Sequence, residues 1–86
     1  MAGMVVEYDT DVGAFYVRVT DGDVARTVEF SPFVSVDLDS NDNVVGLELL
    51  CQPSAVTAAE RAALEERYPM ALTALTEVER LIQPSA

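Results

Sequence analysis

The sequence predicts an α+β fold: a four- or five-stranded antiparallel β-meander followed by two short C-terminal helices packed on one sheet face. Two observations lead to this fold class. Short runs rich in β-branched and aromatic residues, separated by turn formers, fill the first fifty residues. After Cys51 the composition changes to alanine, leucine and glutamate, which favour helix. A chain of 86 residues is one domain, which we divide into a meander over 4–50 and a helical segment over 54–83.

Each expected strand is a short run that ends at a turn. Connections this short favour antiparallel pairing between neighbours in sequence. Asp21–Asp23 carries the Asp-Gly signal of a tight hairpin and is expected to join the second strand to the third. The five expected strands are Met4–Tyr8, Ala14–Thr20, Val24–Phe30, Phe33–Leu38 and Asn43–Leu50.

Alternation along the strands separates an apolar face from a mixed one. In the second strand Phe15, Val17 and Val19 share one face, opposite Tyr16 and Arg18. The fourth and fifth strands alternate in the same way. The sequence therefore predicts a sheet that is covered on one side only.

The third strand, Val24–Phe30, fits this alternation less well. Arg26 shares its face with apolar residues, which is unfavourable in the middle of a covered sheet. Either an edge position or a β-bulge would account for it.

The helical segment begins with a capping box. Thr57 and Glu60 have the spacing at which each side chain caps the backbone of the other, so we expect a helix from there to about Arg67. Pro69 then either separates two helices or kinks one, and both readings stay open. A second helical pattern covers Pro69–Gln83.

Large apolar residues form one stripe along this second helix. The stripe is expected to cover the sheet of its own chain, or to dock on another copy or on another protein. Homo-oligomerisation is a simple way for so small a domain to bury additional apolar surface. The stripe consists of Leu72, Leu75, Val78, Leu81 and Ile82.

The charge restricts the classes of partner. Fifteen acidic residues oppose five basic ones, all arginine, which gives a net charge of −10. Such a chain repels phosphate backbones and anionic lipid, so we expect neither nucleic-acid nor membrane binding. The acidity serves solubility or attracts a basic protein partner. A single cysteine and the absence of a signal peptide or membrane-spanning run predict a cytoplasmic location.

One stretch, Asp37–Glu48, resembles a calcium-binding loop. Its sequence DLDSNDNVVGLE places oxygen-bearing side chains at positions 1, 3, 5, 7 and 12 of the window. Position 6, however, is Asp42 instead of glycine, and the following residues have strand character. At a rise of about 3.3 Å per residue the strand carries Glu48 too far away to complete the site. We therefore interpret the stretch as a hairpin turn and predict no metal site.

The mixed face of the sheet is the candidate polar face. Paired carboxylates beside a tyrosine and an arginine could perform acid–base chemistry in a pocket, whereas on a solvated face they would form cross-strand ion pairs. With no histidine, no lysine and one cysteine, we assign no catalytic residue and no cofactor. The candidate residues are Tyr16, Arg18, Asp37 and Glu48, with Glu29 depending on the phase of its strand.

Several phrases resemble a known family. MVVEYD, AFYVRV, VARTVE and VDLD followed by VVGLELL are similar, in order and spacing, to the YuzE-like family of small bacterial proteins of unknown function, the domain-of-unknown-function family numbered 2283. The similarity covers Met4–Leu50. Two positions depart from its pattern, because Gly13 stands where a second aspartate is usual and Asp42 stands where glycine is usual.

The resemblance implies no established activity. Similar domains are often encoded beside a small basic toxin-like protein, which suggests an antitoxin role as a hypothesis. We therefore expect a non-enzymatic protein-interaction module, an acidic regulator of a basic partner. The alternatives are a purely structural homo-oligomer and a small enzyme that uses the carboxylate-bearing face.

Overall fold

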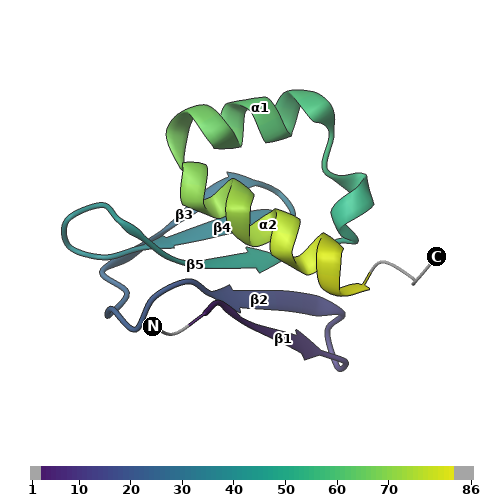
Figure 1. Ribbon diagram of the computed structural model, residues 1–86, viewed down its shortest axis with the longest axis horizontal. Coiled ribbons are helices and arrows are strands. Elements are labelled where there is room, and N and C mark those ends of the chain that lie inside the picture. Colours follow the sequence, from purple (N-terminus) through teal and green to yellow (C-terminus); the bar gives the residue numbers. More distant parts are fainter. Residues whose placement is uncertain (1–2, 83–86) are drawn as a thin grey trace.

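The computed structural model describes residues 3–82 and confirms the α+β fold, with a five-stranded antiparallel sheet followed by two helices (Figure 1). A short 3₁₀ turn connects the sheet to the helices. In chain order the elements are β1 (Val5–Asp9), β2 (Ala14–Arg18), β3 (Arg26–Ser31), β4 (Val34–Leu38), β5 (Val44–Leu49), η1 (Pro53–Ala55), α1 (Ala58–Arg67) and α2 (Pro69–Ile82).

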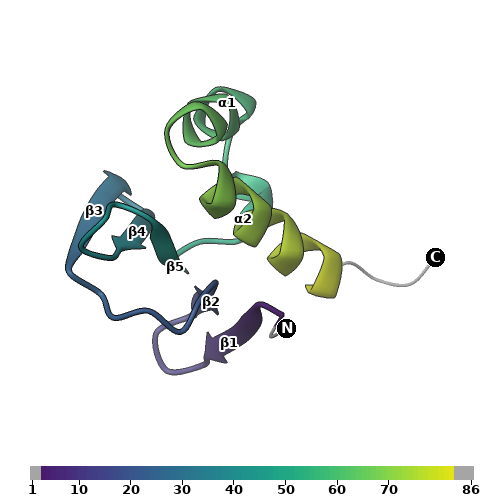
Figure 2. The ribbon, with the colours of Figure 1, turned by 60° about the vertical axis from the view of Figure 1, so that its left-hand side comes forward.

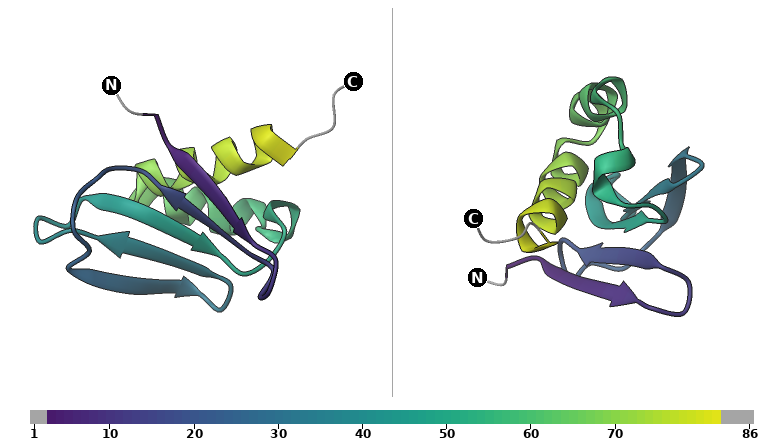
Figure 3. Two further views of the ribbon diagram at one scale, coloured as in Figure 1. Left: turned by 90° about the horizontal axis from the view of Figure 1, so that it is seen from below. Right: turned by 90° about the vertical axis from the view of Figure 1, so that its right-hand side faces the viewer.

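The order of the strands in the sheet differs from a simple meander. It is β1-β2-β5-β4-β3, so β2 pairs with β5 and not with β3. The expected hairpin turn at Asp21–Asp23 is therefore wrong, because this segment belongs to a longer connection that leads to the far edge of the sheet (Figure 3, left). Burial gives the physical reason. The apolar strands β2 and β5 lie inside the sheet, and the strand with the misplaced arginine goes to the edge.

Both explanations for the irregular third strand apply. β3 is an edge strand, and its pairing with β4 shifts register between Glu29 and Ser31. Arg26 is exposed there, and its guanidinium lies 2.8 Å from a carboxylate oxygen of Asp42 in the β4–β5 turn. The edge position thus lets the arginine remain in solvent.

The β4–β5 connection is a hairpin turn, as predicted. Asp39 Oδ1 accepts hydrogen bonds from the amides of Asn41 at 2.8 Å and Asn43 at 2.9 Å. These bonds, that of Asn43 above all, lower the pKa of Asp39. Between these two asparagines, Asp42 adopts the left-handed backbone conformation, with φ of 65°.

The helices lie on the same side of the sheet but in successive layers. α2 packs on β5 and β2, and α1 packs on α2 (Figures 1 and 2). Leu64 of α1 is completely buried and joins the same core as the inward-facing strand residues. Figure 3 (right) shows that no helix within residues 3–82 lies on the opposite face.

The structure resolves the question that the sequence left open at Pro69. The capping box at the start of α1 is complete, with the Thr57 side chain accepting from the Glu60 amide at 3.1 Å and the Glu60 carboxylate accepting from the Thr57 amide at 2.9 Å. α1 ends before Tyr68, whose φ of −141° and ψ of 74° are not helical. Pro69 is then the first residue of a separate helix.

The predicted apolar stripe of α2 is correct only in part. Leu75 and Val78 are completely buried within the chain, and Leu72 is half-buried. Leu81 and Ile82, in contrast, are exposed in the last turn. Two alanines, Ala71 and Ala74, are completely buried on the sheet-facing side of the helix in addition to the large residues. The buried residues of α2 are Ala71, Ala74, Leu75 and Val78.

Candidate functional site

The uncovered face of the sheet presents two rows of side chains, because direct cross-strand partners project to the same side. The first row crosses all five strands in the order β1, β2, β5, β4, β3 and contains three carboxylates. Its members are Glu7, Tyr16, Glu48, Ser35 and Glu29.

The second row lies two residues along each strand and carries the remaining candidates. Its members are Val5, Arg18, Gly46, Asp37 and Thr27. All five candidate residues from the sequence thus share one face, and Glu29, whose phase was open, belongs to it. Sequence reasoning missed Glu7 and Thr27. Alternation within Met4–Tyr8 could have identified Glu7, whereas the irregular third strand concealed Thr27.

Asp37 is the centre of a hydrogen-bond network on this face. The Tyr16 hydroxyl donates to Asp37 Oδ2 at 2.7 Å, and the Thr27 hydroxyl donates to Asp37 Oδ1 at 2.6 Å. The tyrosine reaches Asp37 across β5, where Gly46 has no side chain in the way. A β-carbon at Gly46 would overlap the hydroxyl and Cζ of Tyr16. The glycine is therefore required for the close approach of the ring.

The environment raises the pKa of Tyr16 to about 12. Burial is the largest cause, followed by the hydrogen bond to Asp37 and the negative charge of that carboxylate. The nearby Arg18 has a smaller, opposite effect. At neutral pH the hydroxyl is thus a hydrogen-bond donor to Asp37, and it is poorly suited to act as a base or nucleophile.

Arg18 does not neutralise these carboxylates through a direct ion pair. Its guanidinium donates to the carbonyl of Thr20 at 3.1 Å, back along its own chain. Within residues 3–82 the salt bridges join other residues, namely Arg26 with Asp42, Arg61 with Glu79, and Arg80 with Glu77. The face therefore keeps a strongly acidic character.

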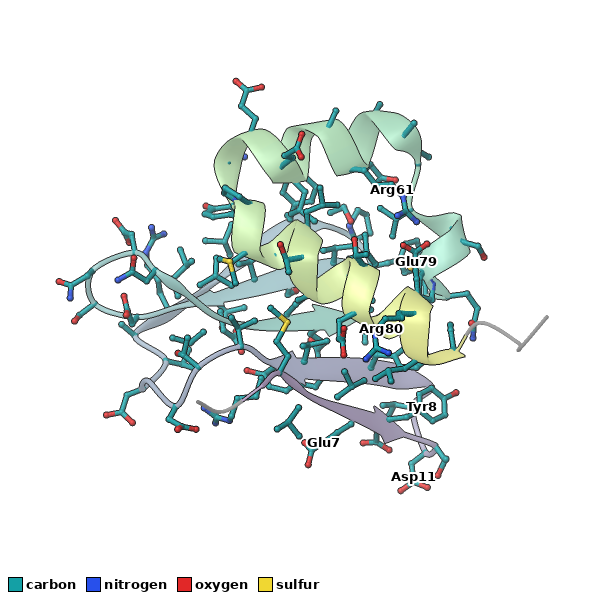
Figure 4. The ribbon with its side chains drawn as sticks, in the orientation of Figure 1. Glu7, Tyr8, Asp11, Arg61, Glu79 and Arg80 are labelled. Carbon is teal, nitrogen blue, oxygen red and sulfur yellow. The ribbon has the colours of Figure 1, made fainter. Side chains whose placement is uncertain are left out.

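A hollow of about 430 Å³ lies at the β1–β2 end of this face. Three carboxylates, those of Glu7, Asp9 and Glu48, contribute to its wall. Figure 4 shows Glu7 and Asp11 pointing away from the helices, on the open side of the sheet. The other residues lining the hollow are Tyr8, Val12, Ala14 and Tyr16.

A second hollow, of about 650 Å³, lies between η1 and the end of α2. Beside it Arg61 makes a bidentate ion pair with Glu79, both N–O distances being 2.8 Å (Figure 4). The same guanidinium donates to the carbonyls of Val56 and Pro53. Each of these groups has a partner within the fold, so we interpret Arg61 as a clamp that holds η1 to α2.

The metal-ligating side chains and the thiol were the remaining candidates within residues 3–82. Among residues 3–82 there is no group of three or more side chains placed to hold a metal ion. Cys51 is half-buried, and its pKa is raised by burial first and then by the charge of Glu60. A raised pKa keeps the thiol protonated and unreactive at neutral pH.

Taken together, the sheet, its two helical layers and its open acidic face define a small acidic α+β domain. The chain belongs to the family described as "Protein of unknown function (DUF2283)", which matches residues 5–51, more than half of its length. The match includes all five strands and ends at Cys51, so α1 and α2 lie outside it. No curated protein and no solved structure matched the chain. No helix within residues 3–82 has the length and apolar character needed to cross a membrane.

Proposed function

We propose that this protein is a non-enzymatic interaction module that binds a basic protein on the uncovered face of its sheet, as an antitoxin-like regulator would. One observation supports this proposal above the others. Four of the five strands each place a carboxylate on that face, and Arg18 is the basic side chain that the described strands add to it. These carboxylates are Glu7, Glu29, Asp37 and Glu48, and β1 adds Asp9 at its end.

The spacing of these groups favours a protein partner with several positive charges. The carboxylates of the first row stand on alternate strands, about 10 Å apart, and Asp37 of the second row lies diagonally between Glu48 and Glu29. At physiological salt the screening length is about 8 Å, which is comparable with these separations, so the fields of neighbouring carboxylates overlap in part. Such a field accelerates the approach of a basic partner and repels nucleic acid.

The hydrogen bonds at Asp37 support a structural role for the tyrosine. With a pKa of about 12, Tyr16 stays protonated and holds Asp37 in place on the face. A site for acid–base catalysis would instead need a group whose pKa lies near the working pH. This argument favours the interaction module over the small enzyme that the sequence left as an alternative.

A cytoplasmic location accompanies the proposal. A regulator that binds a basic protein inside the cell needs no disulfide, and the sequence has the single cysteine Cys51.

Binding to a genetically linked basic protein tests the function. The chain is co-expressed with the product of an adjacent gene that encodes a small basic protein, and growth and complex formation are measured. We expect a complex whose affinity falls with rising salt, and relief of any growth inhibition that the basic protein causes. Glu48→Lys, at the centre of the acidic face, should weaken binding by about tenfold.

Glu65→Lys is the matched control, because it makes the same change of charge at an exposed position of α1. It should leave the affinity nearly unchanged. Equal effects of the two substitutions would indicate attraction by net charge alone. The absence of both a complex and growth relief would contradict the proposed function.

A further inference from the structure

β1 is the more regular of the two edges of the sheet. The two edge strands are β1 and β3. The register of β3 shifts between Glu29 and Ser31, and such irregularities discourage a further strand from pairing. β1, in contrast, pairs with β2 in one unbroken register from Val5 to Asp9. In Figure 1 β1 is the lowest strand, at the edge of the sheet.

Two hydrogen bonds establish which backbone groups of β1 point outward. The Asp9 carbonyl accepts from the Gly13 amide at 2.8 Å within the β1–β2 hairpin, so Asp9 faces β2. On the other side of β2, the Val19 amide donates to Val45 of β5 at 2.9 Å. Backbone groups alternate in direction along a strand, so the odd-numbered residues of β2 bond to β5 and the even-numbered ones bond to β1. The even-numbered residues of β2 pair with Val5, Glu7 and Asp9, whose amides and carbonyls therefore point toward β2. The amides and carbonyls of Val6 and Tyr8 therefore face away from the sheet.

The two sides of this edge differ in chemistry. On the open face lie Glu7 and Asp9, which line the acidic hollow described above. On the helix side lies Tyr8, which is half-exposed and packs on Phe15 with ring centroids 4.6 Å apart. Figure 4 shows Tyr8 and Glu7 on opposite sides of β1. An added strand would thus meet carboxylates on one side and an aromatic ring on the other.

We propose that β1 is a docking strand, to which a basic partner protein adds an extended segment as the sixth strand of the sheet. The segment alternates basic side chains, which face Glu7 and Asp9, with apolar side chains, which pack on Tyr8. Main-chain hydrogen bonds to Val6 and Tyr8 supply affinity, and the alternating side chains supply specificity. This inference rests on the proposed function and specifies how the basic partner is held.

Charge complementarity favours such a partner over a second copy of the chain. Two β1 strands related by a twofold axis can pair in three registers in which the outward amides and carbonyls of Val6 and Tyr8 bond to each other. These registers place Glu7 opposite Glu7, Glu7 opposite Asp9, or Glu7 diagonal to Glu7 of the other copy. Each copy also has a net charge of −10. Carboxylates that face one another across a strand pair destabilise it, whereas arginine or lysine in the same places stabilises it.

Synthetic peptides test the docking strand directly. The probe is a short peptide that alternates arginine with valine, and its control has the same sequence with N-methylated amides on one edge. N-methylation keeps the charge but removes the donors that pair with β1. By titration calorimetry we expect the control to bind about tenfold more weakly, because it loses main-chain hydrogen bonds. Amide exchange at Val6 and Tyr8 should slow only with the unmodified peptide.

Two charge-reversing variants locate the binding strand. Glu7 and Glu29 occupy opposite ends of the same cross-strand row, and both are exposed. Glu7→Lys should weaken binding of the unmodified peptide by about tenfold, and Glu29→Lys by less than about threefold. Because the two substitutions change the net charge equally, this difference depends on position alone.

The outcomes separate the two proposals. Equal binding of both peptides, or equal effects of both variants, would overturn the docking strand and leave the acidic interaction face in place. If neither peptide bound even at low salt, both proposals would fail. A stable homodimer in light scattering, with Val6 and Tyr8 protected before any peptide is added, would overturn the inference in favour of a second copy.

Discussion

The hydroxyl of Tyr16 reaches across β5 and donates a hydrogen bond to Asp37 Oδ2 at 2.7 Å, directly above the backbone of Gly46. These two residues belong to strands that are not neighbours, since β5 separates β2 from β4. The contact therefore links β2 to β4 across β5, on a face that no helix of the described residues covers.

Gly46→Ala should remove this contact. A β-carbon at Gly46 would overlap Tyr16, so the ring must move away from Asp37. We expect the free energy of unfolding to fall by about 1–3 kcal/mol, as is typical when a tight contact is overfilled. Denaturant titration measures this loss. In the background of Tyr16→Ala the same glycine substitution should cost much less, and additive effects of the two changes would contradict the proposed overlap.

Tyr16 should titrate at high pH. The pKa of Tyr16 is raised to about 12, against an ordinary value of 10.0. Because the folded-state pKa is raised, its contribution to stability is complete below pH 10 and is lost as the pH rises from about 10 to 12. Tyrosinate absorbance should show this late transition, and Tyr16→Phe should remove it. A titration unchanged by that substitution would contradict the assignment.

Substitutions at Asp42 should separate backbone strain from the charge interaction. This residue has φ of 65° and an exposed ion pair with Arg26. Asp42→Ala loses the ion pair and tolerates the left-handed conformation poorly, so we expect a loss of about 1 kcal/mol. Asp42→Gly relieves the strain and should be at least as stable as the parent. Thermal melting checks the order, which would be wrong if the alanine variant equalled the glycine variant.

Arg61→Lys should loosen the clamp between η1 and α2. Lysine cannot reproduce both the bidentate pair with Glu79 and the hydrogen bonds to Val56 and Pro53. We expect a loss of about 1–2 kcal/mol in the free energy of unfolding. Arg80→Lys is the matched control, because Arg80 has a more exposed pair with Glu77. It should leave the melting temperature nearly unchanged, and a comparable drop would argue against the clamp.

The parts of the fold that could be predicted from the sequence are those that depend on residues close together in the chain. The capping box at Thr57 and the separate apolar runs depend on neighbours in the chain, and the structure contains both. The pairing of β2 with β5 depends instead on which strands are apolar enough for the interior of the sheet. The short connection with an Asp-Gly turn signal at Asp21 favoured pairing of the second strand with the third, so the sequence did not indicate that β2 pairs with β5 instead.

The sequence predicted which residues share the candidate face, but not the hydrogen bonds between them. Alternation alone assigned Tyr16 and Asp37 to the same side of the sheet. Their hydrogen bond required the register of three strands and the missing side chain of Gly46, and neither can be read from periodicity. The predicted apolar stripe included the buried Leu75 and Val78 but omitted two buried alanines of α2, because it counted large residues only.

The strand order also determines how the sheet can assemble. The β1–β2 hairpin and the β3–β4–β5 unit each form from residues close in sequence, so each can pair early. Joining β2 to β5 closes a much longer loop and carries the larger entropic cost. This junction is therefore expected to be the late step of folding. Until it forms, the apolar surfaces of the two units and their inner strand edges stay accessible to each other and to other chains.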